Sequence, residues 1–210
     1  MEWESVASET PVCILMRHAE RFHIPVGSVG TDVPLTEKGR QDSRAWGRLY
    51  GGWVRKICAS PISRCVDTAK CIAEGAGLGR EVSLCTELGA PGPFVTDGQL
   101  AWQNWIRLGG AEVNRRLMTT QECLPGMVIP LQGARRLVDF MQKTADGRSG
   151  IHVFVTHDNI LAITIAQLVG VVAEYEGVGW PAFLEASAWW YKGTKLYCEW
   201  SRQVFELTPW

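Results

Sequence analysis

The sequence has 210 residues, 46% of them hydrophobic, which is enough for one α/β domain with a sizeable buried core. Its 21 basic and 22 acidic residues nearly cancel, so the overall charge argues against nucleic acid or an anionic membrane as the habitual partner. No apolar run approaches the length of about 18 residues that indicates a membrane span, and the acidic start lacks a signal-peptide pattern.

The cysteine pattern indicates the compartment and excludes several kinds of site. Seven cysteines is an odd number, and none belongs to a Cys-x-x-Cys or Cys/His grouping, which predicts reduced thiols and a cytoplasmic location. The sequence also lacks a GxGxxG motif and a Gly-rich loop ending in Gly-Lys-Ser/Thr. We therefore expect no cofactor and no metal.

The stretch from Val12 to Arg21 places five apolar residues ahead of four ionisable ones. This order is typical of a buried parallel strand whose carboxyl end opens into a polar site, where α/β sheets bind ligands. Arg17, His18 and Arg21 can all be cationic, and phosphate is the anion that we expect them to bind. Taken alone, an Arg-His pair after a strand is more often a solvated strand end than a catalytic centre. The rest of the sequence is therefore needed to distinguish the two.

After this strand the chain alternates helices and strands. Prolines and glycines predict a loop over residues 22–34, and Thr36 can cap the helix that follows. Arg64 falls in the first turn of the next helix, where unpaired backbone N–H groups favour anions. The expected strands are 54–59, 81–85 and 151–155, and the expected helices are about 36–50, 63–76, 133–143 and 159–169.

This alternation predicts an α/β fold, a three-layer αβα sandwich with a mostly parallel central sheet. Residues 89–131 interrupt the alternation with glycines, prolines and short apolar pieces. We interpret them as a small helical lobe that is inserted into a single domain of residues 1–210 and covers the site, although a plain long connection is the alternative. The chain should end in a last strand or hairpin over 188–207, around a turn at 192–194.

Histidine recurs at the ends of the central strands. The chain has only four histidines, yet His18 and His157 both follow a predicted central strand, each beside an ionisable residue. A third strand end supplies Arg64. Independent core histidines would not be expected to repeat this placement.

Four segments in this order resemble the histidine phosphatase superfamily, which includes phosphoglycerate mutases and histidine acid phosphatases. The resemblance spans roughly residues 12–170. The His157-Asp158 pair and Arg21 are similar to the acid phosphatase branch, whereas Ala19, residues 35–39 and the short chain are similar to the mutase-like branch, so the motifs leave the branch open. The four segments are Arg17-His18-Ala19-Glu20, residues 35–39, Ser60-Pro61 with Arg64 and Thr68-Ala69, and Thr156-His157-Asp158.

The resemblance implies a role for each of five basic residues. His18 would attack phosphorus through one ring nitrogen and form a phosphohistidine, while a backbone carbonyl holds the other nitrogen and sets the tautomer. Arg17, Arg21 and Arg64 would bind the phosphate oxygens, and His157 would add another donor. Crowded cations also favour the neutral form of His18, which is the form that can attack.

A leaving alkoxide needs a proton, and the sequence offers two carboxyl groups for it. Asp158 is favoured because it matches the His-Asp motif, and Glu87, after the third strand, lies where mutase-like relatives carry their acid. Either could instead be structural, since Asp158 could simply cap the following helix.

Three functions fit this reading. The first is a phosphatase that hydrolyses a phosphomonoester, either a small organic phosphate or a phosphorylated protein side chain. The second is a phosphoglycerate-mutase-type phosphotransferase, and the third is a catalytically silent phospholigand-binding or scaffold protein. Release of inorganic phosphate without any added acceptor separates the first from the second.

The sequence does not identify the substrate. Three tryptophans could stack on a substrate ring or simply pack, and three arginines could bind a second anionic group or be solvated. They are Trp102, Trp105 and Trp180, and Arg107, Arg115 and Arg116.

Overall fold

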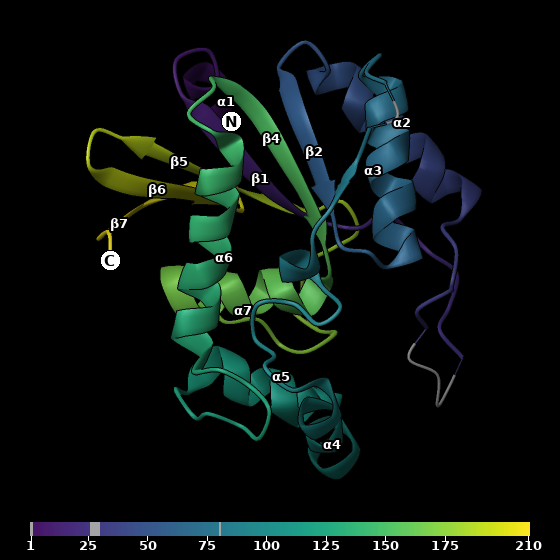
Figure 1. Cartoon of the computed structure of the whole chain (residues 1–210), viewed down its shortest axis with the longest axis vertical. Coiled ribbons are helices and arrows are strands. Elements are labelled where there is room, and N and C mark those ends of the chain that lie inside the picture. Colours follow the sequence, from purple (N-terminus) through teal and green to yellow (C-terminus); the bar gives the residue numbers. More distant parts are fainter. Residues whose placement is uncertain (1, 26–29, 80) are drawn as a thin grey trace.

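A computed structural model describes residues 2–25, 30–79 and 81–210. Within these ranges the chain forms a seven-stranded sheet with the order β3-β2-β4-β1-β5-β6-β7 (Figure 1). The expected loop over 22–34 is described except for residues 26–29. The strands are β1 (Pro11–Arg17), β2 (Val54–Ala59), β3 (Ser83–Leu84), β4 (Gly150–Thr156), β5 (Ala186–Lys192), β6 (Lys195–Trp200) and β7 (Gln203–Leu207).

The sheet is mixed. Strands β3, β2, β4 and β1 are parallel to their neighbours, whereas β5, β6 and β7 add an antiparallel meander beside β1. The α/β fold class is confirmed, but the mostly parallel arrangement is confirmed only for the first four strands. The last strand or hairpin expected over 188–207 is in fact a three-stranded meander, because the chain turns back a second time after β6.

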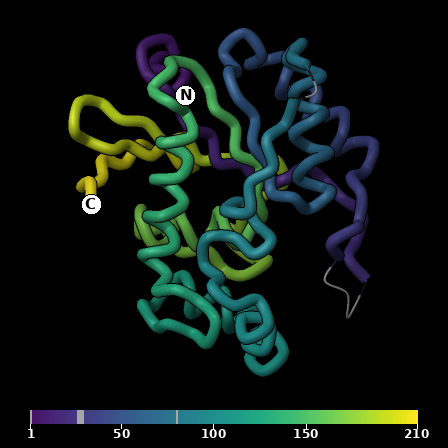
Figure 2. Tube along the Cα trace, in the orientation of Figure 1, coloured from purple at the N-terminus to yellow at the C-terminus, as the bar shows by residue number. Residues whose placement is uncertain are grey.

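Helices cover both faces of the sheet, with α2 and α3 side by side on one face and α6 and α7 on the other (Figures 1 and 2). Strand β1 alternates between two cores accordingly. Ile14 and Met16 pack into the core on the α3 side, whereas Cys13 and Leu15 pack into the core on the α6 and α7 side. The helices are α1 (Glu2–Val6), α2 (Glu37–Tyr50), α3 (Ser63–Gly75), the 3-10 helix η1 (Thr86–Leu88), α4 (Gly98–Leu108), α5 (Gly110–Thr119), α6 (Pro130–Ala145) and α7 (Asp158–Val169).

Local sequence signals explain where several helices begin. The side chain of Thr36 accepts a hydrogen bond from the Gly39 N–H (3.0 Å), which confirms it as the cap of α2. Pro130 occupies the first turn of α6, where its missing N–H costs nothing. Helix α1 was not expected, because five residues are too short for a periodic pattern.

Residues 89–131 contain α4 and α5, and α5 packs against α7 at the end of the molecule beyond the carboxyl edge of β1 and β4 (Figure 1). In the described part of the chain, no helix combines the length and apolarity required to cross a bilayer.

Candidate active site

The parallel pairing of β1 with β4 brings the two strand-end histidines together. Arg17 lies opposite Thr156 in the register, so His18 and His157 occupy equivalent positions just beyond the two strands. The N–H of His18 donates to the carbonyl of Thr156 (2.9 Å), and the two imidazole centroids are 5.8 Å apart. Both side chains are buried.

Hydrogen bonds fix the tautomer of His18. Its Nδ1 lies 2.8 Å from the carbonyl oxygen of Ala19, which can only accept, so Nδ1 carries the proton. The lone pair is therefore on Nε2, and the Nε–H of Arg64 donates to it across 3.0 Å. A neutral imidazole is thus held with its basic nitrogen against a cationic group that can bind phosphate.

Arg64 connects both imidazoles from the first turn of α3. Its Nη2 donates to Nδ1 of His157 (3.1 Å), and its Nη1 donates to the carbonyl of Gly30 (2.7 Å). Because Nδ1 of His157 accepts, its Nε2 carries the proton and donates to Oγ of Ser60 (3.0 Å). His157 is therefore neutral as well in this arrangement.

Arg17 joins the cluster to the acid of the His-Asp motif. Its Nη2 lies 2.9 Å from Oδ2 of Asp158, and its Nη1 donates to the carbonyl of Pro181. The Arg17 guanidinium also lies 4.2 Å from the ring centroid of Phe183, whose ring is 5.8 Å from that of His18. The segment before β5 therefore closes one side of the site.

The remaining two predicted residues, Arg21 and Glu87, have their hydrogen-bond or ion-pair partners outside the histidine cluster. Arg21 donates from Nη1 to the carbonyl of Phe22 (3.0 Å). Burial is the main cause that lowers the pKa of Arg17, Arg64 and His157, and the charge of Arg21 adds a smaller effect in the same direction. Glu87 lies in η1, with its carboxylate 3.9 Å from Nη2 of Arg136 on α6. The structure thus pairs Asp158 with Arg17 of the cluster, and it pairs Glu87 with a cation outside the cluster.

Burial keeps both imidazoles neutral. Desolvation lowers the pKa of His18 well below the usual 6.5, and the Ala19 hydrogen bond offsets this only in part. The pKa of His157 falls to about 3, chiefly through burial and then through the charge of Arg64. Near neutral pH, His18 is consequently present in the form that can act as a nucleophile.

The sequence profile of the histidine phosphatase superfamily (branch 1) matches residues 13–177. The chain belongs to this family. The match confirms the resemblance drawn from the motifs and assigns the branch that they left open. No curated protein matches the sequence.

Solved structures share the fold of this histidine phosphatase family member. A mycobacterial glucosyl-3-phosphoglycerate phosphatase, solved with inorganic phosphate, has a TM-score of 0.56 at 20% identity over 95% of this chain and 96% of its own. An Entamoeba histolytica phosphoserine phosphatase, crystallised as a mutant with phosphoserine, has a TM-score of 0.56 at 18% identity over 95% of both chains. A Bacillus anthracis phosphoglycerate mutase has a TM-score of 0.56 at 15% identity over 87% of this chain and 88% of its own. At these identities the likeness concerns the fold alone.

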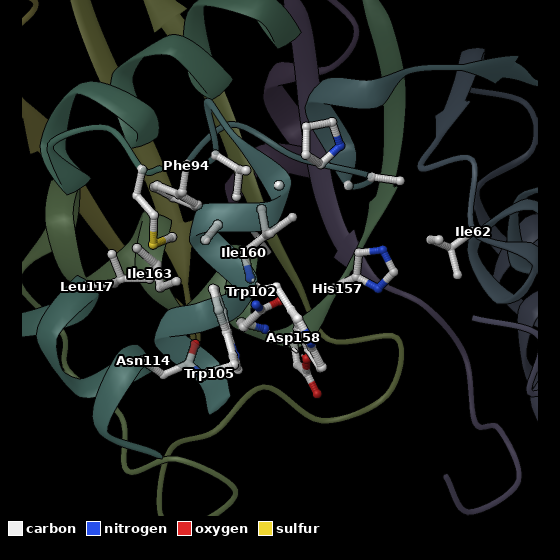
Figure 3. A pocket seen from close by; sticks show the side chains of 18 of the residues that line it. Ile62, Phe94, Trp102, Trp105, Asn114, Leu117, His157, Asp158, Ile160 and Ile163 are labelled. Atoms are coloured by element: carbon white, nitrogen blue, oxygen red, sulfur yellow. Dashed lines mark hydrogen bonds between the residues drawn. The ribbon is translucent and has the colours of Figure 1, made fainter. Parts of the chain in front are cut away.

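A cavity of about 470 Å³ opens from this family member's histidine cluster into the segment 89–131 (Figure 3). Arg64, His157 and Asp158 line its inner end, and Trp102 and Trp105 line its wall. These tryptophans thus lie where a substrate ring could meet them. Trp180 instead packs edge-on against Tyr175, with ring centroids 5.0 Å apart.

Some residues of the site had no role assigned from the sequence. Ser60 bonds to His157, Phe183 packs on Arg17, and Gly89 approaches His157 so closely that a Cβ there would lie 2.6 Å from its Nε2. Ser60 belongs to a recognised motif, and its place at a strand end was a usable signal. Gly89 and Phe183 lie in irregular segments, where no periodicity indicates what they contact.

Proposed function

We propose that this protein is a phosphatase that hydrolyses phosphomonoesters through a covalent phosphohistidine on His18. The observation that carries the proposal is the orientation of the His18 ring. Nδ1 is held by the Ala19 carbonyl, and Nε2 presents its lone pair to Arg64 at the inner end of the cavity. A neutral nucleophile beside a guanidinium suits attack on a phosphorus atom whose oxygens that guanidinium binds.

In the first step, Nε2 of His18 attacks phosphorus and the bond from phosphorus to the ester oxygen breaks. Arg17, Arg21 and Arg64 neutralise the non-bridging oxygens, and Arg64 exchanges its bonds to the imidazoles for bonds to phosphate. His157 adds a further hydrogen bond to phosphate through its Nε2–H, which then leaves Oγ of Ser60. The product is the phosphohistidine, with the alcohol as leaving group.

Asp158 supplies the proton that the leaving oxygen needs. Its Oδ2 is paired with Arg17 (2.9 Å) in the absence of substrate. A phosphate that takes over Arg17 frees this oxygen, and the carboxylate then takes up a proton from solvent before it donates that proton to the leaving oxygen. In the second step a water molecule gives its proton back to Asp158 and attacks phosphorus, the P–N bond breaks, and inorganic phosphate and neutral His18 are formed. Atoms and charge balance over the cycle.

The test is a trapping experiment with p-nitrophenyl phosphate and no added acceptor. We expect release of inorganic phosphate and, after a rapid quench, acid-labile and base-stable phosphate on the protein. His18→Ala should abolish both, whereas His23→Ala, an exposed histidine in the loop after β1, should retain both.

Two outcomes would overturn the proposal. A phosphoryl group that leaves the protein only when a second acceptor is supplied, and then appears as an ester of that acceptor, would indicate a mutase-type transferase. A folded protein that takes up no phosphate from any donor would indicate a silent phospholigand-binding protein.

A further inference from the structure

The end of the cavity remote from His157 holds a buried acceptor without a donor. Asn114, on α5, is 2% exposed and lines the cavity. Its Nδ2 donates to the carbonyl of Gly110 (2.8 Å), but no donor for its Oδ1 exists among the residues that the structure describes. Buried carbonyl oxygens are normally paired, and one that faces a ligand cavity is a site for a ligand's donor.

The walls around this acceptor are apolar. Phe94, Leu117 and Ile163 line the same part of the cavity, together with Trp105. Figure 3 shows Asn114 beside Leu117 and Trp105, on the opposite side of the view from His157. The cavity therefore runs from a cationic end that suits phosphate to an apolar end with one neutral acceptor.

A second anionic group finds no partner here. Within the described part of the chain, the only cationic side chain that lines the cavity is Arg64. Arg115 and Arg116 pair with Glu112 instead (2.7 and 2.6 Å), and Arg107 does not line the cavity. The expectation that these arginines are solvated helix charges fits this arrangement better than a role in binding a second anion.

We infer that the cavity takes a small phosphomonoester whose alcohol part is an apolar, ring-containing body with a neutral hydrogen-bond donor at the end remote from phosphate, received by Oδ1 of Asn114. This inference rests on the proposed function, because it places phosphate at His18. Trp102 and Trp105 flank the body of the ligand, and the lack of a second cation disfavours small carboxylated phosphates.

A panel of matched aryl phosphates tests the inference. Each is a 2-naphthyl phosphate that carries either a hydroxymethyl or an ethyl group at ring position 5, 6 or 7, so that the two members of a pair differ only in the donor. We expect at least one hydroxymethyl ester to have a kcat/KM about tenfold above its ethyl partner, because only it satisfies the Asn114 carbonyl oxygen. 3-Phosphoglycerate should be a poor substrate.

Asn114→Leu should remove this preference by raising KM for the hydroxymethyl ester, with KM for its ethyl partner as the internal reference. Trp102→Ala, at a position 45% exposed, should weaken both members of a pair equally. The inference is overturned if no hydroxymethyl ester exceeds its partner in the wild type, or if the preference persists in Asn114→Leu. The wild-type comparison stands even if that variant fails to fold.

Calorimetric binding of the same pairs to His18→Ala separates the two proposals. A donor preference in Kd without any turnover by the wild type would support the Asn114 site and contradict the phosphatase. Turnover of p-nitrophenyl phosphate without any donor preference would support the phosphatase and contradict the Asn114 site.

Discussion

The Nε–H of Arg64 donates to Nε2 of His18 across 3.0 Å. A guanidinium in a protein cannot give up its proton at ordinary pH, so the bond requires a lone pair on that imidazole nitrogen. The same side chain reaches Nδ1 of His157 through Nη2 (3.1 Å). Arg64 thus holds two neutral histidines in fixed orientations, and phosphate has to replace these bonds when it enters.

Replacing Arg64 by lysine tests whether the forked geometry matters beyond the charge. Lysine keeps the cation but lacks the planar fork that can bridge the two imidazoles or bind two phosphate oxygens, so we expect kcat/KM on p-nitrophenyl phosphate to fall about 10²- to 10³-fold. Arg44→Lys is the matched control, since Arg44 pairs with Glu74 on the outer surface (3.0 Å) and its loss should leave kcat/KM unchanged. Equal activity of the two variants would show that charge alone suffices.

Asp158→Asn separates proton donation from simple positioning of Arg17. An alkoxide leaving group needs a proton and p-nitrophenolate hardly does, so turnover of an alkyl phosphate should fall about 10²-fold or more, and that of p-nitrophenyl phosphate much less. Glu87→Gln should leave both substrates nearly unaffected, because that carboxylate pairs with Arg136. Equal losses on both substrates in Asp158→Asn would remove this residue from the role of acid, and a selective loss in Glu87→Gln would transfer the role.

The parts of the fold that follow from local signals were predictable. β1 and β4 are short, largely apolar runs, and α2 has a recognisable cap at Thr36. The β6–β7 turn has no such signal. Ser201 and Arg202 both adopt positive φ (49° and 64°), a conformation that usually calls for Asn or Gly, so the sequence conceals the second turn of the meander.

The site likewise combines residues whose placement could be predicted from the sequence with residues whose placement could not. Parallel strands end at one edge of a sheet, so residues that directly follow β1 and β4, such as His18 and His157, could be expected to meet. Asn114 and Pro181 reach the cavity or the cluster from segments that are placed only by tertiary packing. Neither a spacing nor a propensity in the sequence indicates those contacts.

The low pKa of His157 predicts a specific dependence of stability on pH. Its pKa is about 3 in the folded protein and near the ordinary 6.5 when unfolded, so between these values the unfolded chain binds the extra proton. The free energy of unfolding should therefore fall as the pH is lowered through this window, by about 1.4 kcal/mol per pH unit from His157 alone.

Urea unfolding of the wild type and of His157→Asn at several pH values between 4 and 7 measures this slope. The variant should lose stability less steeply on acidification, while His23→Asn, at an exposed loop position, should follow the wild type. Parallel slopes for the wild type and His157→Asn would show that the folded protein tolerates the charged imidazole.

Gly89 offers a test of how closely the site is packed around His157. Its φ is 143°, and an added Cβ would lie 2.6 Å from Nε2 of His157 and 2.7 Å from Oγ of Ser60. Gly89→Ala must therefore displace the imidazole that Ser60 and Arg64 hold, and the strained backbone adds a cost of about 1–3 kcal/mol. We expect a lower melting temperature together with a drop in kcat larger than the rise in KM.

Gly52→Ala, where nothing lies within 4 Å of the new methyl group, should change neither the melting temperature nor the kinetic constants. A Gly89→Ala protein that is destabilised but fully active would mean that the orientation of His157 does not limit the reaction.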